Sequence, residues 1–144
     1  MDKKKNSDDS LIYNIIEAIE NIKGKEINIL DLRELENTVC DYFIVCEGSS
    51  NTQVNAIVAS IQKHVSKELK DKPWNIEGND NGEWVLMDYI DVVVHIFNEE
   101  TRKYYKIEEL WEEANSTLVE SKGLNKVAFA NSYPAVEFSI SKGT

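Results

Sequence analysis

The stretch GEWVLMDYIDVVVHIF, residues 82–97, decides the fold of this chain. Two runs rich in β-branched and aromatic residues, 83–88 and 91–97, are separated by so short a connection that an antiparallel hairpin turning at Tyr89 and Ile90 is predicted. The same stretch contains two aspartates and a histidine, residue types that acid/base and metal sites use. It therefore raises two alternatives, a catalytic site or a docking surface.

Helices are predicted on both sides of this hairpin. Asp9 or Ser10 can cap the first helix, and Ser50 with Gln53 three residues later has the spacing of a capping box for the second. Asn98 can cap the acidic turn that precedes the third. The segments with apolar residues at helical spacing are residues 11–22, 54–69 and 105–114.

Further strands complete an α/β pattern. Residues 26–32 alternate, residues 42–46 are apolar on both parities, and residues 74–77 can form a short strand. A run that is apolar on both parities is expected of an interior strand covered on both faces. The sequence predicts an α/β domain with a mixed sheet flanked by helices, unlike the regular alternation of a doubly wound nucleotide-binding fold.

The length of 144 residues suits one domain whose core needs neither disulfides nor a structural metal. We expect a frayed N-terminus at residues 1–9, a domain at 10–115 and an appendage of unknown role at 116–144. Cys40 and Cys46 lack the spacing of a metal or redox site and predict buried reduced thiols. No apolar run approaches the ~20 residues that span a bilayer, so a soluble cytoplasmic protein without membrane contact is expected.

The charge balance limits the possible partners. The chain carries 26 acidic and 16 basic side chains, a formal net charge of -10. Such a field repels phosphate backbones on average, so little direct contact with nucleic acid is expected. A protein surface is the better match for a partner.

Catalysis finds weaker support in the motifs. A divergent Mg²⁺-dependent nucleotidyltransferase, the alternative function, would use Ser49, Ser50, Asp88 and Asp91, but it needs paired carboxylates on a strand, which are absent after Ser50. The loop at Ser49 also lacks the lysine of a Walker motif, so a helix cap explains it. His95 is expected to be a hydrogen-bonded sheet residue. We therefore expect no catalytic residues, no metal site and no cofactor.

Aromatic residues beside carboxylates favour the docking alternative. Trp84 and Tyr89 lie at the start and the turn of the predicted hairpin, close to Asp88 and Asp91. Protein-binding surfaces favour such aromatic residues because they supply a large apolar area with few rotors to freeze. For Trp84 and Tyr89 a core position remains an equal alternative, whereas Trp111 lies in a helical stripe and is expected in the core.

Three long motifs together resemble the ribosomal silencing factor family, also called the iojap-related family. They are DYFIVCEGSSNTQV at 41–54, EWVLMDYIDVVVHIF at 83–97 and TRKYYKIEELW at 101–111. The resemblance covers about residues 11–111. The chain departs from the family at Cys46 and Glu47, where many members have smaller or less charged residues, and at Ile90, where glycine is frequent. It implies an α/β fold related to the nucleotidyltransferases but without their catalytic carboxylates.

The resemblance also implies a function. Family members bind the large ribosomal subunit through ribosomal protein fourteen of that subunit, prevent the small subunit from joining and so lower translation when nutrients are scarce. Homodimers occur in the family, so a homodimer is possible here, and an adaptor acting away from the ribosome is a further alternative. The resemblance places partner binding on Trp84, Met87, Asp88, Tyr89 and Asp91, with Arg102 and Tyr105 as second-tier candidates.

Overall fold

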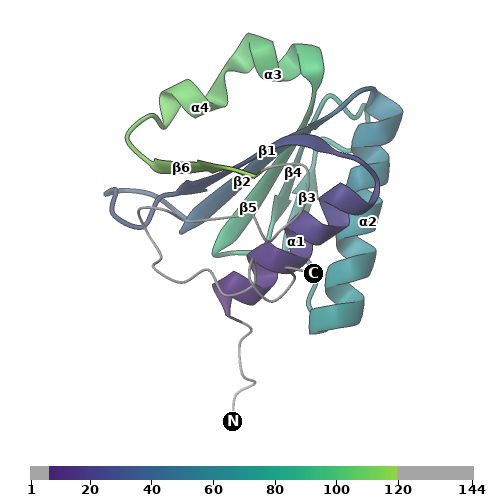
Figure 1. The fold of residues 1–144 in the computed structure, drawn as a ribbon, viewed down its shortest axis with the longest axis horizontal. Coiled ribbons are helices and arrows are strands. Elements are labelled where there is room, and N and C mark those ends of the chain that lie inside the picture. Colours follow the sequence, from purple (N-terminus) through teal and green to yellow (C-terminus); the bar gives the residue numbers. More distant parts are fainter. Residues whose placement is uncertain (1–6, 120–144) are drawn as a thin grey trace.

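The computed structural model describes residues 7–119, which form one mixed sheet with helices on both sides. The strand order across the sheet is β3-β4-β5-β2-β1-β6. In chain order the elements are α1 (Asp8–Asn21), β1 (Lys25–Asp31), β2 (Tyr42–Gly48), α2 (Asn51–Leu69), β3 (Asn75–Glu77), β4 (Trp84–Asp88), β5 (Val92–Asn98), α3 (Glu99–Tyr105), α4 (Ile107–Leu110) and β6 (Asn115–Leu118). The long helices α1 and α2 lie on one side of the sheet, and the short helices α3 and α4 lie on the other (Figure 1).

Strands β2 and β5 form the centre of the sheet. They are its one parallel pair, in register from Tyr42 opposite Val92 to Gly48 opposite Asn98. Both are buried along nearly their whole length, which for β2 confirms the interior position predicted from apolar residues on both parities. The predicted hairpin is also confirmed, because β4 pairs antiparallel with β5 and the backbone N–H of Tyr89 donates to the carbonyl of Val92 at 2.8 Å.

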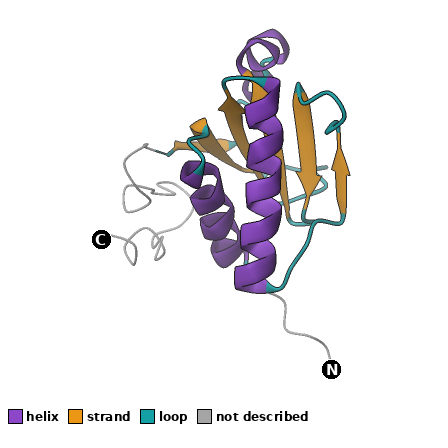
Figure 2. Cartoon of the chain, turned by 90° about the vertical axis from the view of Figure 1, so that its right-hand side faces the viewer, coloured by secondary structure: helices purple, strands orange, loops and turns teal. Residues whose placement is uncertain are grey.

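The larger core lies between the sheet and helices α1 and α2, which run side by side (Figure 2). The helices contribute their apolar stripes, and the strands contribute every second residue. Ser50 caps α2 as predicted, with its Oγ accepting from the backbone N–H of Gln53 at 3.0 Å. The largest fully buried side chains of this core include Ile12, Ile15, Ile16, Ile19, Ile29, Tyr42, Ile44 and Ile57.

A smaller core lies on the second face of the sheet, beneath α3 and α4. Asn98 caps α3 as predicted and accepts from the N–H of Thr101 at 2.9 Å. The prediction of a single helix over residues 105–114 is wrong. The chain breaks at Lys106, which has a left-handed φ of 47°, and only one turn of helix, α4, follows. The fully buried or nearly buried members of this core are Leu30, Leu32, Cys40, Val45, Val93, Phe97 and Ile107.

Both ends of the described chain extend further than expected. Ser7, rather than Asp9 or Ser10, caps α1, because its Oγ accepts from the N–H of Ser10 at 3.1 Å. At the other end β6 pairs antiparallel with β1, so residues 116–118, expected in an appendage, extend the sheet. The rest of the expected appendage, residues 120–144, lies outside the described residues.

Cys40 and Cys46 are buried free cysteines, as predicted. Burial raises the pKa of each thiol to about 12, so both are protonated and poor nucleophiles. None of the helices within residues 7–119 is both long and apolar enough to cross a membrane.

The turn between β4 and β5 leads to a first prediction. Ile90 has a φ of 80°, a conformation that costs a β-branched residue roughly 1–2 kcal/mol and that glycine adopts freely. Replacing Ile90 with glycine should raise the free energy of unfolding by about 0.5–1 kcal/mol, since glycine entropy offsets part of the gain. Urea unfolding measures it. Ile90→Ala, which keeps a Cβ, is the control, and an alanine variant as stable as the glycine variant would contradict the strain argument.

Candidate functional site

The second face of the sheet exposes apolar side chains that α3 and α4 cover only in part. Alternation along β4 places Trp84 and Leu86 on this face, while Val85 and Met87 point into the α1–α2 core. We call this surface the aromatic face. Its members are Phe43, Trp84, Leu86, Tyr105 and Trp111, of which Tyr105 is about half exposed and the others are partly exposed.

Trp84 makes the most ring contacts on the aromatic face. Its indole stacks on Phe97 at a centroid distance of 4.9 Å and an interplanar angle of 27°. Tyr105, from the end of α3, lies 4.8 Å from the same indole and remains 49% exposed. The face continues through Phe43 to Trp111, whose rings meet edge to face at 5.4 Å. The rings are therefore held by one another and still present apolar area to solvent.

His95 lies beneath this layer and is only 4% exposed. It is opposite Leu86 on β4, and its Nδ1 accepts a hydrogen bond from the indole N–H of Trp84 at 3.1 Å. The expectation of a hydrogen-bonded sheet histidine is confirmed. Burial lowers the pKa of His95 from 6.5 to about 4, so the ring is neutral at physiological pH.

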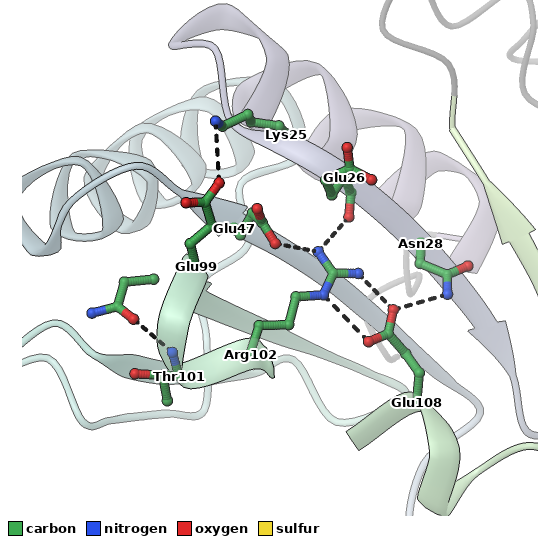
Figure 3. Close-up of polar contacts among 9 residues, drawn as sticks. Lys25, Glu26, Asn28, Glu47, Glu99, Thr101, Arg102 and Glu108 are labelled. Carbon is green, nitrogen blue, oxygen red and sulfur yellow. Dashed lines mark hydrogen bonds and ion pairs between the residues drawn. The ribbon is translucent and has the colours of Figure 1, made fainter. Parts of the chain in front are cut away.

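Arg102 holds α3 and α4 against the sheet (Figure 3). Its side chain is 11% exposed, and its guanidinium donates to Glu47 on β2 at 3.2 Å, to Glu108 on α4 at 3.3 Å and to the carbonyl of Glu26 on β1 at 2.7 Å. Asn28 also donates to Glu108, at 3.2 Å. Four elements are thus joined at one cation.

The two carboxylates around Arg102 differ in their environments. Burial raises the pKa of Glu47, and the nearby Arg102 only partly opposes this effect. Burial would also raise the pKa of Glu108, but hydrogen bonds from Arg102 and Asn28 outweigh it and hold this pKa below its usual value. Glu108 is therefore the dominant ionic partner of Arg102.

The structure places three of the residues predicted for docking largely inside the fold. Met87 is fully buried and Tyr89 is 6% exposed, both in the core beneath α1 and α2, because their parity is opposite to that of Trp84. Arg102 is 11% exposed and forms ion pairs with Glu47 and Glu108 of its own chain, so its observed contacts are internal.

The other predicted residues lie at the surface. Trp84 and Tyr105 contact each other, as described, and Asp88 follows Trp84 and Leu86 on the same side of β4, partly exposed. Asp88 also accepts from the N–H of Ile90 at 2.8 Å. Asp91 lies at the end of the sheet, where its carbonyl accepts from the backbone N–H groups of Asp41 and Tyr42.

The residues of the catalytic alternative are not brought together. Ser49 and Ser50 follow the end of β2, whereas Asp91 precedes the start of the parallel strand β5. At about 3.3 Å per residue, the two groups lie roughly 20 Å apart, too far to share a metal ion. The carboxylate of Asp91 instead lies with those of Asp8 and Asp41, whose oxygens are within 4.8 Å of one another.

A pocket with acidic walls adjoins the aromatic face at Trp111. Its apolar lining comes from Leu35, Leu110 and Trp111, and Leu110 is 77% exposed. The remaining lining residues are all carboxylates: Glu34, Glu36, Glu109, Glu112 and Glu113. The aromatic face is therefore flanked by negative charge.

Sequence reasoning missed Phe43 and Leu86 as members of this surface. The alternation of β4 was a usable signal for Leu86, since it lies two residues after Trp84. Phe43 offered no local signal because its neighbours in β2 are buried on both faces. Trp111, expected in the core, is packed against it but stays partly exposed.

Comparisons with known proteins agree on one family. The family described as "Ribosomal silencing factor during starvation" matches residues 4–139. Ribosomal silencing factor RsfS of Chromobacterium violaceum is 46% identical over 96 residues, 67% of this chain and 77% of that protein. RsfS of Halalkalibacterium halodurans is 32% identical over 114 residues, 79% of this chain and 96% of that protein. Chloroplastic protein Iojap of Zea mays is 32% identical over 111 residues, 77% of this chain and 46% of that protein.

Solved structures show the same likeness. A crystal structure of a Chromobacterium violaceum protein has a TM-score of 0.70 at 41% identity and covers 74% of this chain and 88% of that chain. A crystal structure from Bacillus halodurans has a TM-score of 0.63 at 33% identity, covering 71% of this chain and 93% of that chain. The α/β architecture with its mixed sheet is therefore shared with these relatives.

Removing Arg102 should destabilise the chain. Arg102→Met leaves Glu47 and Glu108 without their cation in a largely buried site, so the free energy of unfolding should fall by about 3 kcal/mol. Lys103→Met is the matched control, because Lys103 is exposed and should change it by less than about 0.5 kcal/mol. Adding Glu47→Gln and Glu108→Gln to Arg102→Met should recover part of the loss. Urea unfolding that ranks the two single variants equally would contradict the role of Arg102 as a tether.

His95 should make stability depend on pH. The folded chain keeps His95 neutral down to about pH 4, whereas the unfolded chain binds a proton near pH 6.5, so stability is lost as pH falls between these values. The loss attributable to His95 is about 3 kcal/mol. Urea unfolding of the wild type and His95→Asn at pH 7 and pH 4 measures it. If the difference in free energy of unfolding between wild type and His95→Asn is the same at pH 7 and pH 4, the pH dependence does not come from His95.

Proposed function

This chain belongs to the ribosomal silencing factor family, and we propose that it lowers translation by occupying the large ribosomal subunit. In this proposal it binds ribosomal protein fourteen of that subunit and blocks the small subunit from joining when nutrients are scarce. The observation that carries the proposal is the aromatic face, where partly exposed apolar side chains from several elements lie together.

The aromatic face supplies suitable anchors for a protein partner. Trp84 and Tyr105 are in contact and already restrained by their neighbours, so little side-chain entropy is lost when they bind. Leu86 and Phe43 extend the apolar area, and Asp88 borders it with a carboxylate that can pair with Arg or Lys. We propose Trp84, Leu86, Asp88 and Tyr105 as the centre of the interface, with Asp91 at its margin.

The charge of the chain supports a basic protein as the partner. Ribosomal proteins are usually basic, and a chain with a net charge of -10 is attracted to one without gripping RNA. The acidic pocket beside Trp111 adds to this attraction at the edge of the aromatic face. The proposal therefore includes little direct contact with nucleic acid.

The mechanism is occlusion rather than catalysis. A domain seated where the two subunits meet needs an interface of standard size, on the order of 1,600 Å² in total, and makes or breaks no bond. The proposal accordingly includes no cofactor, action in the cytoplasm and a possible homodimer. An ancestral relation to the nucleotidyltransferases, without their carboxylates, belongs to the same proposal.

Sedimentation with purified ribosomal subunits tests the function. The wild-type chain should migrate with large subunits and reduce the fraction of whole ribosomes that forms when small subunits are added. Trp84→Ala should lose an anchor and weaken binding by about 2 kcal/mol or more, and Tyr105→Ala should act in the same direction. Trp74→Ala is the matched control, because Trp74 is also exposed, at 77%. Its neighbour Asn75 is paired with Asp88 on the side of the aromatic face, so alternation directs Trp74 to the other side of the sheet.

The outcomes separate the alternatives. A wild-type chain that stays at the top of the gradient, or that leaves subunit joining unchanged, would refute the proposal. Circular dichroism of Trp84→Ala shows whether its loss of binding is a loss of folding, in which case Tyr105→Ala decides. Protection from thermal unfolding by ATP or CTP that requires Mg²⁺ would instead support the nucleotidyltransferase alternative.

A further inference from the structure

We infer that His95 is a positioning residue, which fixes the indole of Trp84 in the orientation that the aromatic face presents to its partner. The existence of a partner rests on the proposed function, whereas the positioning of Trp84 rests on the geometry of the two rings. Trp84 and His95 are diagonal neighbours on the antiparallel strands β4 and β5, since Leu86 is directly opposite His95 and Trp84 is directly opposite Phe97.

The hydrogen bond between the two rings defines the protonation of His95. The indole Nε1 is only a donor, so the Nδ1 that lies 3.1 Å from it must be an acceptor. A neutral imidazole with an acceptor at Nδ1 carries its proton on Nε2. His95 is therefore the Nε2–H tautomer, and the bond to Trp84 exists only in this tautomer.

The rest of the site gives no other reason for a histidine at this position. His95 lies in an apolar layer with Phe43 at a ring distance of 4.5 Å and Phe97 at 6.3 Å. Its Nε2 is buried and has no hydrogen-bond partner among the described residues, 7–119. An apolar side chain would fill the layer without burying an unpaired polar atom. The acceptor that His95 offers to Trp84 is the contact that an apolar residue could not replace.

The bond restrains a motion that packing leaves free. Phe97 stacks on one side of Trp84, and Tyr105 lies 4.8 Å away from the same indole. Stacking is tolerant of rotation of the indole within its own plane, whereas a hydrogen bond to one ring nitrogen selects one orientation. Trp84 is thus fixed before binding, which lowers the entropy lost on docking.

Nuclear magnetic resonance of the wild-type chain tests the positioning without any binding partner. The ¹⁵N shifts of the His95 ring should show the Nε2–H tautomer. The indole N–H of Trp84, assigned with Trp84→Phe, should exchange with solvent more slowly than that of the exposed Trp74. An Nδ1–H tautomer, or a Trp84 indole that exchanges as fast as that of Trp74, would overturn the inference.

Two substitutions then test the effect on docking. His95→Asn keeps an acceptor at the δ position, and His95→Leu removes it at similar size. Binding to isolated large subunits should weaken about fivefold to tenfold in His95→Leu, the size expected for one neutral hydrogen bond, and should stay close to wild type in His95→Asn. The Trp84 indole N–H should lose its protection in the leucine variant alone.

The results distinguish this inference from the proposed function. If the wild type binds and Trp84→Ala does not, but His95→Leu binds like the wild type, the inference fails and the function stands. Equal loss of binding in both His95 variants, with an unchanged Trp84 indole signal, would show a merely structural role and also overturn it. If the wild type does not bind, the proposed function fails, and the indole and imidazole signals alone decide whether His95 positions Trp84.

Discussion

The parallel pair of β2 and β5 at the centre of the sheet requires the rest of the chain to cover both faces of the sheet. Both strands are apolar on both faces, so each face needs a cover. Helices α1 and α2 supply one with long apolar stripes. The other cover is α3 and α4, of seven and four residues, which are too short to bury much area by themselves. The ion network of Arg102 ties them to β1 and β2 and completes the fold.

The incompleteness of that second cover is what creates a surface. Where α3 and α4 stop, Trp84 packs against Tyr105 and Phe43 packs against Trp111, and these rings remain partly open to solvent. Leaving such area exposed gives up hydrophobic stabilisation, which binding of a partner would recover. Arg102 contributes indirectly, because the helix it tethers carries Tyr105. The same network therefore stabilises the fold and shapes the candidate site.

Local patterns in the sequence predicted most of the fold. The hairpin, the interior strand and the caps Ser50 and Asn98 depend on neighbours within a few residues, and all are present. The strand β6 was not predicted, because Asn115–Leu118 is short and weakly apolar and exists through pairing with β1. The break at Lys106 was hidden by apolar spacing that suited one continuous helix.

The candidate site was less predictable because its contacts are distant in sequence. Arg102 lies 55 residues from Glu47 and 76 from Glu26, so no spacing rule connects them. The error at Met87 was of another kind, since alternation from Trp84 already directed it to the opposite face. Surface residues on a predicted strand can therefore be chosen only after alternation has assigned each side chain to one face of the sheet.

Charge and aromatic anchors have separate roles in the proposed docking. A net charge of -10 makes contact with the phosphate backbone of RNA unfavourable. Only a basic protein patch that also accepts Trp84 and Tyr105 offsets that repulsion. Long-range attraction mainly sets the rate of encounter, whereas buried anchors mainly set the rate of release. In the proposed mechanism occlusion lasts only as long as the complex, so its duration would depend on the restrained orientation of the indole more than on the charge.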